Sequence, residues 1–200
     1  MHRSVRATRD ETTRSLPGDE LITSPIGSFT HAVTITASAR DVWPWLAQMG
    51  AGTRAGWYSY DLLDNGRRPS ATRIIPELQS LEVGIVFPAL PGARDAFTLL
   101  SYEPDRFLVL GWQSPAGSPL VTWAFVLEQR QPTTRLLVRA RGASDYSFHR
   151  LPRSVSRRVI RLIHFVMQRK QLIEIAERAE RSAVGAERPS ESTGVTQCNA

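Results

Sequence analysis

The sequence predicts an α+β fold in which one long C-terminal helix lies against a curved antiparallel β-sheet. Five strand-like segments follow one another between residues 81 and 141, separated by proline-containing breakers, which is typical of an antiparallel meander. An earlier segment, residues 31–37, alternates apolar and polar residues as a half-buried strand does. Residues 152–181 instead show the period of a helix with a wide apolar face. Such a helix needs a large concave partner, which a curved sheet supplies.

The composition fits one soluble globular domain with polar ends. The chain has 200 residues, of which 42% are hydrophobic and 22% charged. These values exclude a mostly disordered protein, a collagen-like chain and a membrane bundle. Residues 1–15 and 183–200 are too polar to bury much apolar area, so we expect two disordered tails. The folded domain is expected over residues 16–182.

The first strand leads into a short helix. Val33 and Ile35 alternate with threonines within residues 31–37. Ser38 and Asp41 have the spacing of a capping box, with Asp in the place usually taken by Glu or Gln. A short helix is therefore expected to follow, kinked near Pro44 because an interior proline removes a hydrogen bond.

The middle of the chain contains the meander. Residues 60–63 are expected to form one helical turn before the Asn65–Gly66 turn. The expected strands then cover residues 81–87, 96–102, 107–112, 120–127 and 134–141. A long helix rarely packs evenly along a curved sheet, so we expect a pocket between the two, where a ligand would bind.

The charge balance is basic, with a net charge of +6 and a pI of about 10.4. Arginines are dense between Arg135 and Lys170. This segment could make a weak contact with an anionic membrane or bind nucleic acid without sequence preference. It could equally be a solvated face that pairs with acidic residues of the C-terminal helix. No motif of a specific nucleic-acid reader is present, so no specific nucleic acid is expected as a partner.

Several function classes lack their motifs. The only cysteine, Cys198, excludes an intrachain disulfide. The first fifteen residues lack the apolar core of a signal peptide, and we expect a cytoplasmic protein. No histidines and carboxylates stand at metal-ligand spacing, and no glycine-rich nucleotide fingerprint occurs. We therefore expect no metal and no cofactor. The oligomeric state is left open.

Four segments resemble one superfamily. They are VTITASARDVWPWLAQMG (residues 33–50), AGWYSYDLLDN (55–65), PELQSLEVG (76–84) and HFVMQRKQLIEIAERAE (164–180). The chain resembles the START/polyketide cyclase superfamily, also called SRPBCC, and within it an uncharacterised bacterial subgroup. This resemblance implies the helix-grip fold and a deep apolar cavity between sheet and helix. Members bind lipids, sterols or polyketides, and some are cyclases, aromatases or hydrolases. They share no catalytic residue set, so none is carried over.

Aromatic residues are the candidates for lining this cavity. Residues 57–65 combine aromatic rings with two aspartates, which is typical of a pocket mouth but also of turn and packing chemistry. Trp123 and Phe125 share one face of a strand because side chains alternate. The candidate ligand-binding residues are Trp43, Trp57, Tyr58, Tyr60, Trp112, Trp123, Phe125, His164 and Met167.

Three functions stay open. The first is binding of a small hydrophobic ligand, such as a lipid, a polyketide or an aromatic compound. The second is a cyclase-, aromatase- or hydrolase-type enzyme that uses Asp61, Asp64 or His164 as general acid or base. The third is a basic interaction module at an anionic membrane or nucleic acid. Each acid and the histidine also has a structural interpretation, in turn formation or at the helix boundary.

Overall fold

A single antiparallel sheet organises the molecule. The computed structural model describes residues 3–92, 96–143 and 153–186, and within the last helix it describes the side chains of residues 165–185. The six strands lie in the order β1-β6-β5-β4-β3-β2. They are β1 (Gly27–Ile35), β2 (Val86–Pro88), β3 (Ala96–Glu103), β4 (Phe107–Gln113), β5 (Pro119–Arg130) and β6 (Thr133–Gly142).

The predicted meander is confirmed, and the first strand of the chain pairs with the last strand of the meander. Strands β2 to β6 pair consecutively, and β1 pairs along its whole length with β6. All six strands lie close to their predicted positions, and two of them begin four or more residues away from the predicted start. β1 begins at Gly27, four residues early, because the pairing with β6 reaches Gly142. β2 is confined to Val86–Pro88, because the preceding residues form a turn around Gly84, whose φ is +98°.

The short helices follow the capping signals in the sequence. Helix α2 (Ala39–Ala47) contains Pro44 and begins at a complete capping box. The Ser38 hydroxyl accepts a 3.2 Å hydrogen bond from the Asp41 amide, and the Asp41 carboxylate accepts one of 3.2 Å from the Ser38 amide. Helix α3 (Asp61–Asp64) is the predicted single turn, and the 3₁₀ turn η2 (Pro76–Leu78) precedes β2.

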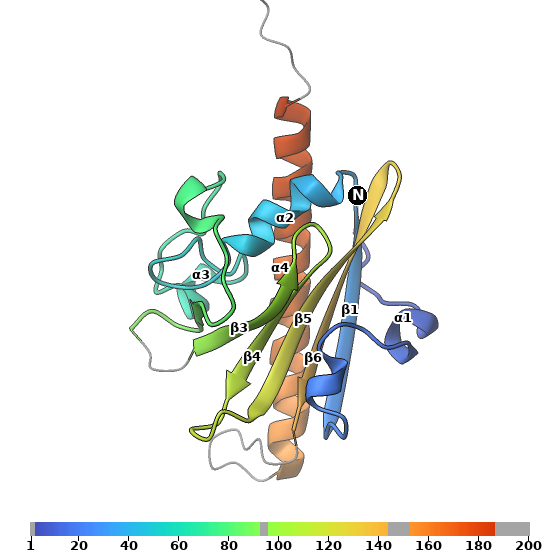
Figure 1. Ribbon diagram of the computed structural model, residues 1–200, viewed down its shortest axis with the longest axis vertical. Coiled ribbons are helices and arrows are strands. Elements are labelled where there is room, and N and C mark those ends of the chain that lie inside the picture. Colours follow the sequence, from blue (N-terminus) through green and yellow to red (C-terminus); the bar gives the residue numbers. More distant parts are fainter. Residues whose placement is uncertain (1–2, 93–95, 144–152, 187–200) are drawn as a thin grey trace, which may run out of the picture.

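The long helix α4 (Arg153–Ala186) lies behind the sheet along most of the length of the strands (Figure 1). Leu172, Ile175, Ala176 and Ala179 are fully buried in the core that the helix shares with the sheet and α2. The predicted helix is therefore confirmed, and its buried apolar face is described within residues 165–185. The helix continues to Ala186, so residues 183–186, which the sequence analysis assigned to the C-terminal tail, are helical, and the rest of that predicted tail lies outside the described residues. No helix among the described residues is both long and apolar enough to cross a membrane.

The N-terminal residues differ from the disordered tail that the sequence predicts. Helix α1 (Arg9–Thr13) and the 3₁₀ turn η1 (Asp19–Leu21) lie against the outer face of the sheet, on the side opposite α4 (Figure 1). Val5 and Leu16 are buried. Leu16 packs in a second apolar cluster with residues of β1, β5 and β6.

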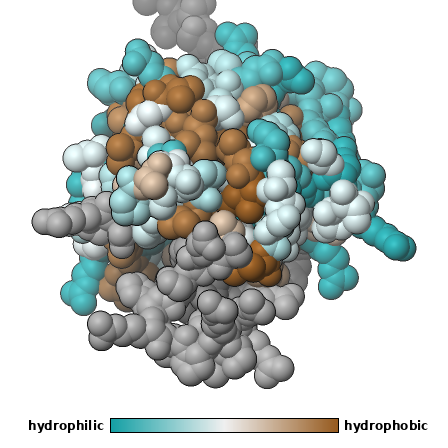
Figure 2. All heavy atoms as spheres, turned by 60° about the horizontal axis from the view of Figure 1, so that its bottom comes forward, coloured by the Kyte–Doolittle hydropathy of each residue, from teal (hydrophilic) through white to brown (hydrophobic). Residues whose placement is uncertain are grey.

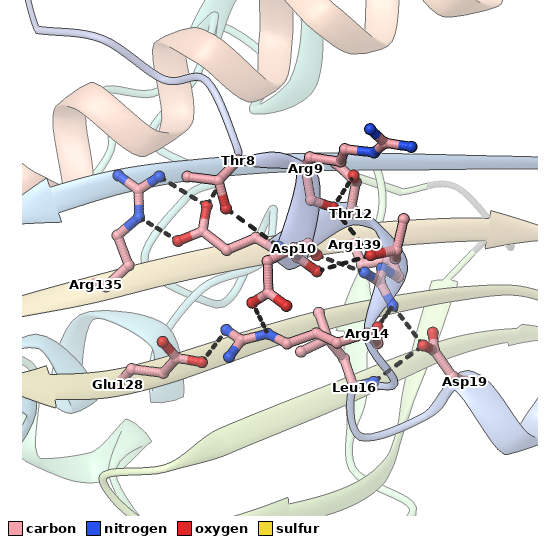
Figure 3. Close-up of polar contacts among 12 residues, drawn as sticks. Thr8, Arg9, Asp10, Thr12, Arg14, Leu16, Asp19, Glu128, Arg135 and Arg139 are labelled. Atoms are coloured by element: carbon pink, nitrogen blue, oxygen red, sulfur yellow. Dashed lines mark hydrogen bonds and ion pairs between the residues drawn. The ribbon is translucent and has the colours of Figure 1, made fainter.

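Arginines of β6 explain why this polar segment is ordered. Arg135 donates 2.9 Å hydrogen bonds from Nε and Nη2 to the two carboxylate oxygens of Glu11, which is 2% exposed. Arg139 and Arg141 both pair with Asp19. Figure 3 shows Arg135 and Arg139 reaching the N-terminal segment from the strand beneath it. The prediction of a basic surface or solvated face is wrong for these three arginines, because they neutralise acids of the same chain.

Candidate functional site

Aromatic rings gather on the inner face of the sheet, where α4 lies. Trp123 is at the centre, with ring centroids 5.2 Å from Trp57, 5.0 Å from Phe125 and 5.4 Å from Phe97. Trp112 contacts Phe97 edge to face at 5.7 Å. Four of these five residues are predicted ligand-binding residues. We call the five residues Trp57, Phe97, Trp112, Trp123 and Phe125 the aromatic cluster.

Strand register produces this cluster. Trp123 pairs with Leu110 on β4 and with Ala140 on β6, and Phe125 lies two residues further on the same face. Trp57 and Phe125 are buried, whereas Phe97, Trp112 and Trp123 are half-buried. The small Ala140 side chain beside Trp123 leaves one flank of the indole without a bulky neighbour on β6. The cluster therefore has a packed base and an accessible aromatic part.

A chain of side-chain amides fixes two of the tryptophans to α4. The Trp123 indole donates to Gln168 Oε1 at 3.0 Å, and Gln168 Nε2 donates to Gln171 Oε1 at 2.7 Å. Gln171 Nε2 in turn donates to the Trp57 carbonyl at 3.0 Å. Both glutamines are 2% exposed. Because the indole and amide donors are used within the protein, this part of the site offers ring faces rather than hydrogen bonds.

The loop before α3 places Trp57 in the cluster. Its indole N–H lies 3.1 Å from the carbonyl of Pro88 and 3.2 Å from that of Ala89, at the end of β2. The preceding Gly56 has a φ of +87°, and a Cβ there would lie 2.2 Å from Ser70 Oγ. Only glycine fits this close approach. The loop is thereby held where its tryptophan reaches across to β5.

His31 lies outside the set of predicted site residues and is a further candidate. It lies on β1 two and four residues before the buried Val33 and Ile35, so its side chain is on the inner face. Its ring centroid is 5.6 Å from that of Phe165 on α4. Burial lowers the pKa of the His31 imidazole, which favours the neutral form. The alternation with Val33 and Ile35 is a signal that could have found it.

Asp64 is a buried acid, and among the described residues neither of its carboxylate oxygens has a hydrogen-bond partner. It is 4% exposed and ends α3. Burial raises the pKa of this carboxyl, and the neighbouring Asp61 raises it further. The Ser59 side chain and nearby backbone amides oppose that rise without completing a hydrogen bond to either oxygen. Ser59 donates instead to the Met167 carbonyl of α4, at 3.3 Å. Asp64 is therefore an acid that can exchange a proton above the usual range of an aspartate.

Asp61 has a structural role in the same loop. Its carboxylate accepts hydrogen bonds from the Ser70 amide at 2.9 Å and the Ser70 hydroxyl at 2.5 Å. Both oxygens are therefore used in closing the loop between residues 61 and 70. Of the two candidate aspartates, the geometry favours Asp64 for proton transfer.

The other predicted residues lie outside the aromatic cluster. Trp43 stacks on Tyr102 at 6.3 Å, and Tyr58 is buried against Trp45 with its hydroxyl accepting a 2.8 Å hydrogen bond from Gln48. Tyr60 is 39% exposed. Met167 is half-buried beside Gln168. The side chain of His164 lies outside the described residues.

The surface has a groove and an area rich in apolar side chains. A shallow groove of about 360 Å³ lies near the C-terminal end of α4, lined by Glu177, Glu180, Arg181 and Val184, and contains none of the predicted residues. Viewed from the end formed by the β4–β5 hairpin, apolar side chains cover much of the left and centre, and hydrophilic ones dominate the right (Figure 2). Within the described part of the chain, no three His, Cys, Asp or Glu residues are grouped to hold a metal ion.

Comparison with known proteins gives structural neighbours only. No family model and no curated protein matches the chain. A protein from Mesorhizobium loti is 15% identical over 78% of this chain and 98% of its own, with a TM-score of 0.48. CalU16 from Micromonospora echinospora is 15% identical over 99% and 84%, with a TM-score of 0.46. A Polyketide_cyc-like protein from Corynebacterium glutamicum is 14% identical over 81% and 96%, with a TM-score of 0.39.

The chain has a helix-grip fold. One antiparallel sheet, two short helices after the first strand and a long C-terminal helix across the inner face form the arrangement that the superfamily resemblance implied. The fold prediction is confirmed by this architecture. Because one fold carries many functions, the function has to be argued from the site.

Proposed function

We propose that the chain binds a small hydrophobic, ring-containing molecule between the inner face of the sheet and α4. The observation that carries this proposal is the accessible part of the aromatic cluster. Phe97, Trp112 and Trp123 are half-buried although they stand on the side of the sheet that faces the core. Large rings left accessible beside a core are typical of ligand sites.

The chemistry of the cluster favours a planar ligand of aromatic or polyketide type over a flexible acyl chain. Aromatic rings gain from offset stacking and edge-to-face contacts with another ring. The donors nearest to Trp123 are occupied by Gln168 and Gln171, so a ligand needs few polar groups there. Binding is expected to stabilise the folded chain by mass action.

A titration with emodin, a planar hydroxyanthraquinone, tests this proposal, with myristic acid as the flexible comparison. Trp123→Leu removes the central ring and is expected to weaken emodin binding about tenfold or more, the loss of roughly 1.4 kcal/mol. Trp43→Phe is the matched control, because Trp43 stacks on Tyr102 outside the cluster, and its affinity should equal that of the wild type. Equal losses in both variants, or no saturable binding to the folded wild type, would contradict the proposal.

Asp64 favours a second function, a cyclase- or hydrolase-type reaction with this carboxyl as general acid or base. The supporting observation is its burial with both oxygens unpartnered. The test uses whatever compound co-purifies with the chain, extracted and incubated with wild type, Asp64→Asn and His164→Asn. If the wild type converts the compound and Asp64→Asn does not, the result supports an enzymatic reaction that uses Asp64. Retention of the compound unchanged by all three proteins supports binding alone.

A further inference from the structure

Helix α3 turns its acidic side chains toward the protein and its leucines toward solvent, which is the reverse of an ordinary surface helix. In its sequence, Asp-Leu-Leu-Asp, Asp64 is buried and Asp61 is half-buried, whereas Leu62 and Leu63 are each 64% exposed. A helix at the surface of a soluble domain usually turns its apolar side toward the core. Here the orientation is fixed by the protein, since Asp61 accepts two hydrogen bonds from Ser70.

Neighbouring segments carry further exposed apolar side chains. Tyr60, directly before α3, is 39% exposed, and Leu90 is 44% exposed. The loop that carries Leu90 lies against the end of the α3 loop, because a Cβ on Gly66 would be 3.1 Å from Pro91 Cγ. We call Tyr60, Leu62, Leu63 and Leu90 the leucine tip.

The charges beside the leucine tip are positive. Arg67 and Arg68 follow α3 and are both exposed, and Arg68 donates to the Gly52 carbonyl at 2.8 Å. The two acids of this loop are turned inward, away from the solvent that the arginines face. Exposed leucines, an interfacial tyrosine and adjacent arginines together match a membrane interface, where apolar groups enter the acyl region and cations meet anionic headgroups.

We propose that the leucine tip docks the protein on an anionic lipid bilayer, with Leu62 and Leu63 inserted and Arg67 and Arg68 at the headgroups. The charge complementarity selects a bilayer as the occupant. A stable contact with a second copy would need a far larger surface, on the order of 800 Å² from each partner, whereas binding at a membrane interface combines a small apolar surface with the attraction of cations to anionic lipids. This docking is independent of the ligand proposed for the aromatic cluster.

Sedimentation with phosphatidylcholine vesicles, with and without phosphatidylserine, tests the docking. The wild type is expected to bind the phosphatidylserine vesicles more strongly, with an affinity that falls as salt rises. Leu62→Ser/Leu63→Ser is expected to lower vesicle partitioning about tenfold or more, because two apolar side chains no longer enter the bilayer. Arg67→Gln is expected to lower partitioning about fivefold on the anionic vesicles only.

Matched controls keep the test specific. Val83→Ser removes an equally exposed apolar residue, 65% exposed, that is not part of the leucine tip, and should partition as the wild type does. Trp123→Leu should also bind vesicles normally, so the docking and the ligand proposal can fail separately. Circular dichroism confirms that each variant is folded. Absence of wild-type binding, equal loss in Val83→Ser, or a leucine-dependent dimer in analytical ultracentrifugation without vesicle binding would overturn the proposal.

Discussion

Asp64 has two buried carboxylate oxygens that accept no hydrogen bond, so its ionised form is disfavoured in the folded state. Its pKa is raised, first by burial and then by Asp61. Below about pH 4, the ordinary pKa of an aspartate, the carboxyl is protonated and its contribution to stability is fully present. This contribution is lost as the pH rises through the pKa that Asp64 has in the folded state. At neutral pH, Asp64 therefore costs stability.

Asp64→Asn is expected to raise the free energy of unfolding at pH 7, by on the order of 1 kcal/mol, because a neutral amide replaces the buried charge. The gain should shrink as the pH falls toward 4, where the aspartate itself is neutral. Urea unfolding at both pH values measures the two differences. A loss of equal size at both pH values would show that the carboxylate is well accommodated. Asp61→Asn is the control and should destabilise at pH 7, since Ser70 loses one of its two acceptors.

The pKa of Glu11 is shifted in the opposite direction to that of Asp64. The hydrogen bond from Arg135 is the largest cause that lowers the pKa of Glu11, from 4.5 to about 2, while burial opposes it. The contribution of the ionised carboxylate is therefore present above about pH 4.5 and lost as the pH falls toward 2. Glu11→Gln is expected to lose about 2 kcal/mol of stability at pH 7, and much less at pH 2.5. Denaturant midpoints at the two pH values check this, and a pH-independent difference would argue against the ion pair.

At the level of single residues, the sequence was informative wherever one strand alone decides the geometry. Trp123 and Phe125 could be placed on one face from the alternation of side chains. His31 follows the same alternation with Val33 and Ile35, although it was not singled out. Phe97 was missed because its position depends on which strands pair and in which register, and the sequence alone does not specify this. The unpartnered state of Asp64 likewise arises from packing of α3 against segments distant in the chain.

The N-terminal segment is the element that the sequence described least well. Composition indicated a tail, because residues 3–15 contain few apolar side chains. The order comes from partners more than a hundred residues away, since Glu11 and Asp19 pair with arginines of β6. Charge complementarity over such a separation leaves no local pattern. The capping box at Thr8 and Glu11 was a local signal that could have predicted α1.

Deletion of residues 1–15 is expected to destabilise the domain by several degrees in Tm, because it removes Glu11 and uncovers Arg139, which is 4% exposed. Thermal unfolding followed by circular dichroism measures the change. A matched variant lacking residues 187–200 controls for truncation itself. An unchanged Tm after the N-terminal deletion would show that this segment behaves as a tail in solution.

For the whole molecule, the fold was predictable because independent signals agreed. The breakers between residues 81 and 141 indicate a meander, the capping box at Ser38 indicates a short helix, and the period after residue 152 indicates a long helix. Together these signals allow few arrangements of the chain. The function was less predictable, because a helix-grip fold does not name its ligand. The site is assembled from β3, β4, β5, α4 and the loop at Trp57, so its chemistry becomes visible only once these elements are placed.

The five tryptophans of the chain provide a direct test of where a ligand binds. Trp57, Trp112 and Trp123 belong to the aromatic cluster, whereas Trp43 and Trp45 lie on α2 against Tyr102 and Tyr58. The measurement is a ¹H–¹⁵N correlation spectrum of the indole N–H groups during a titration with emodin. We expect saturable shifts of the three cluster resonances, with those of Trp43 and Trp45 nearly unchanged. Shifts confined to the two α2 tryptophans, or no saturable shift at all, would contradict a ligand site on the aromatic cluster.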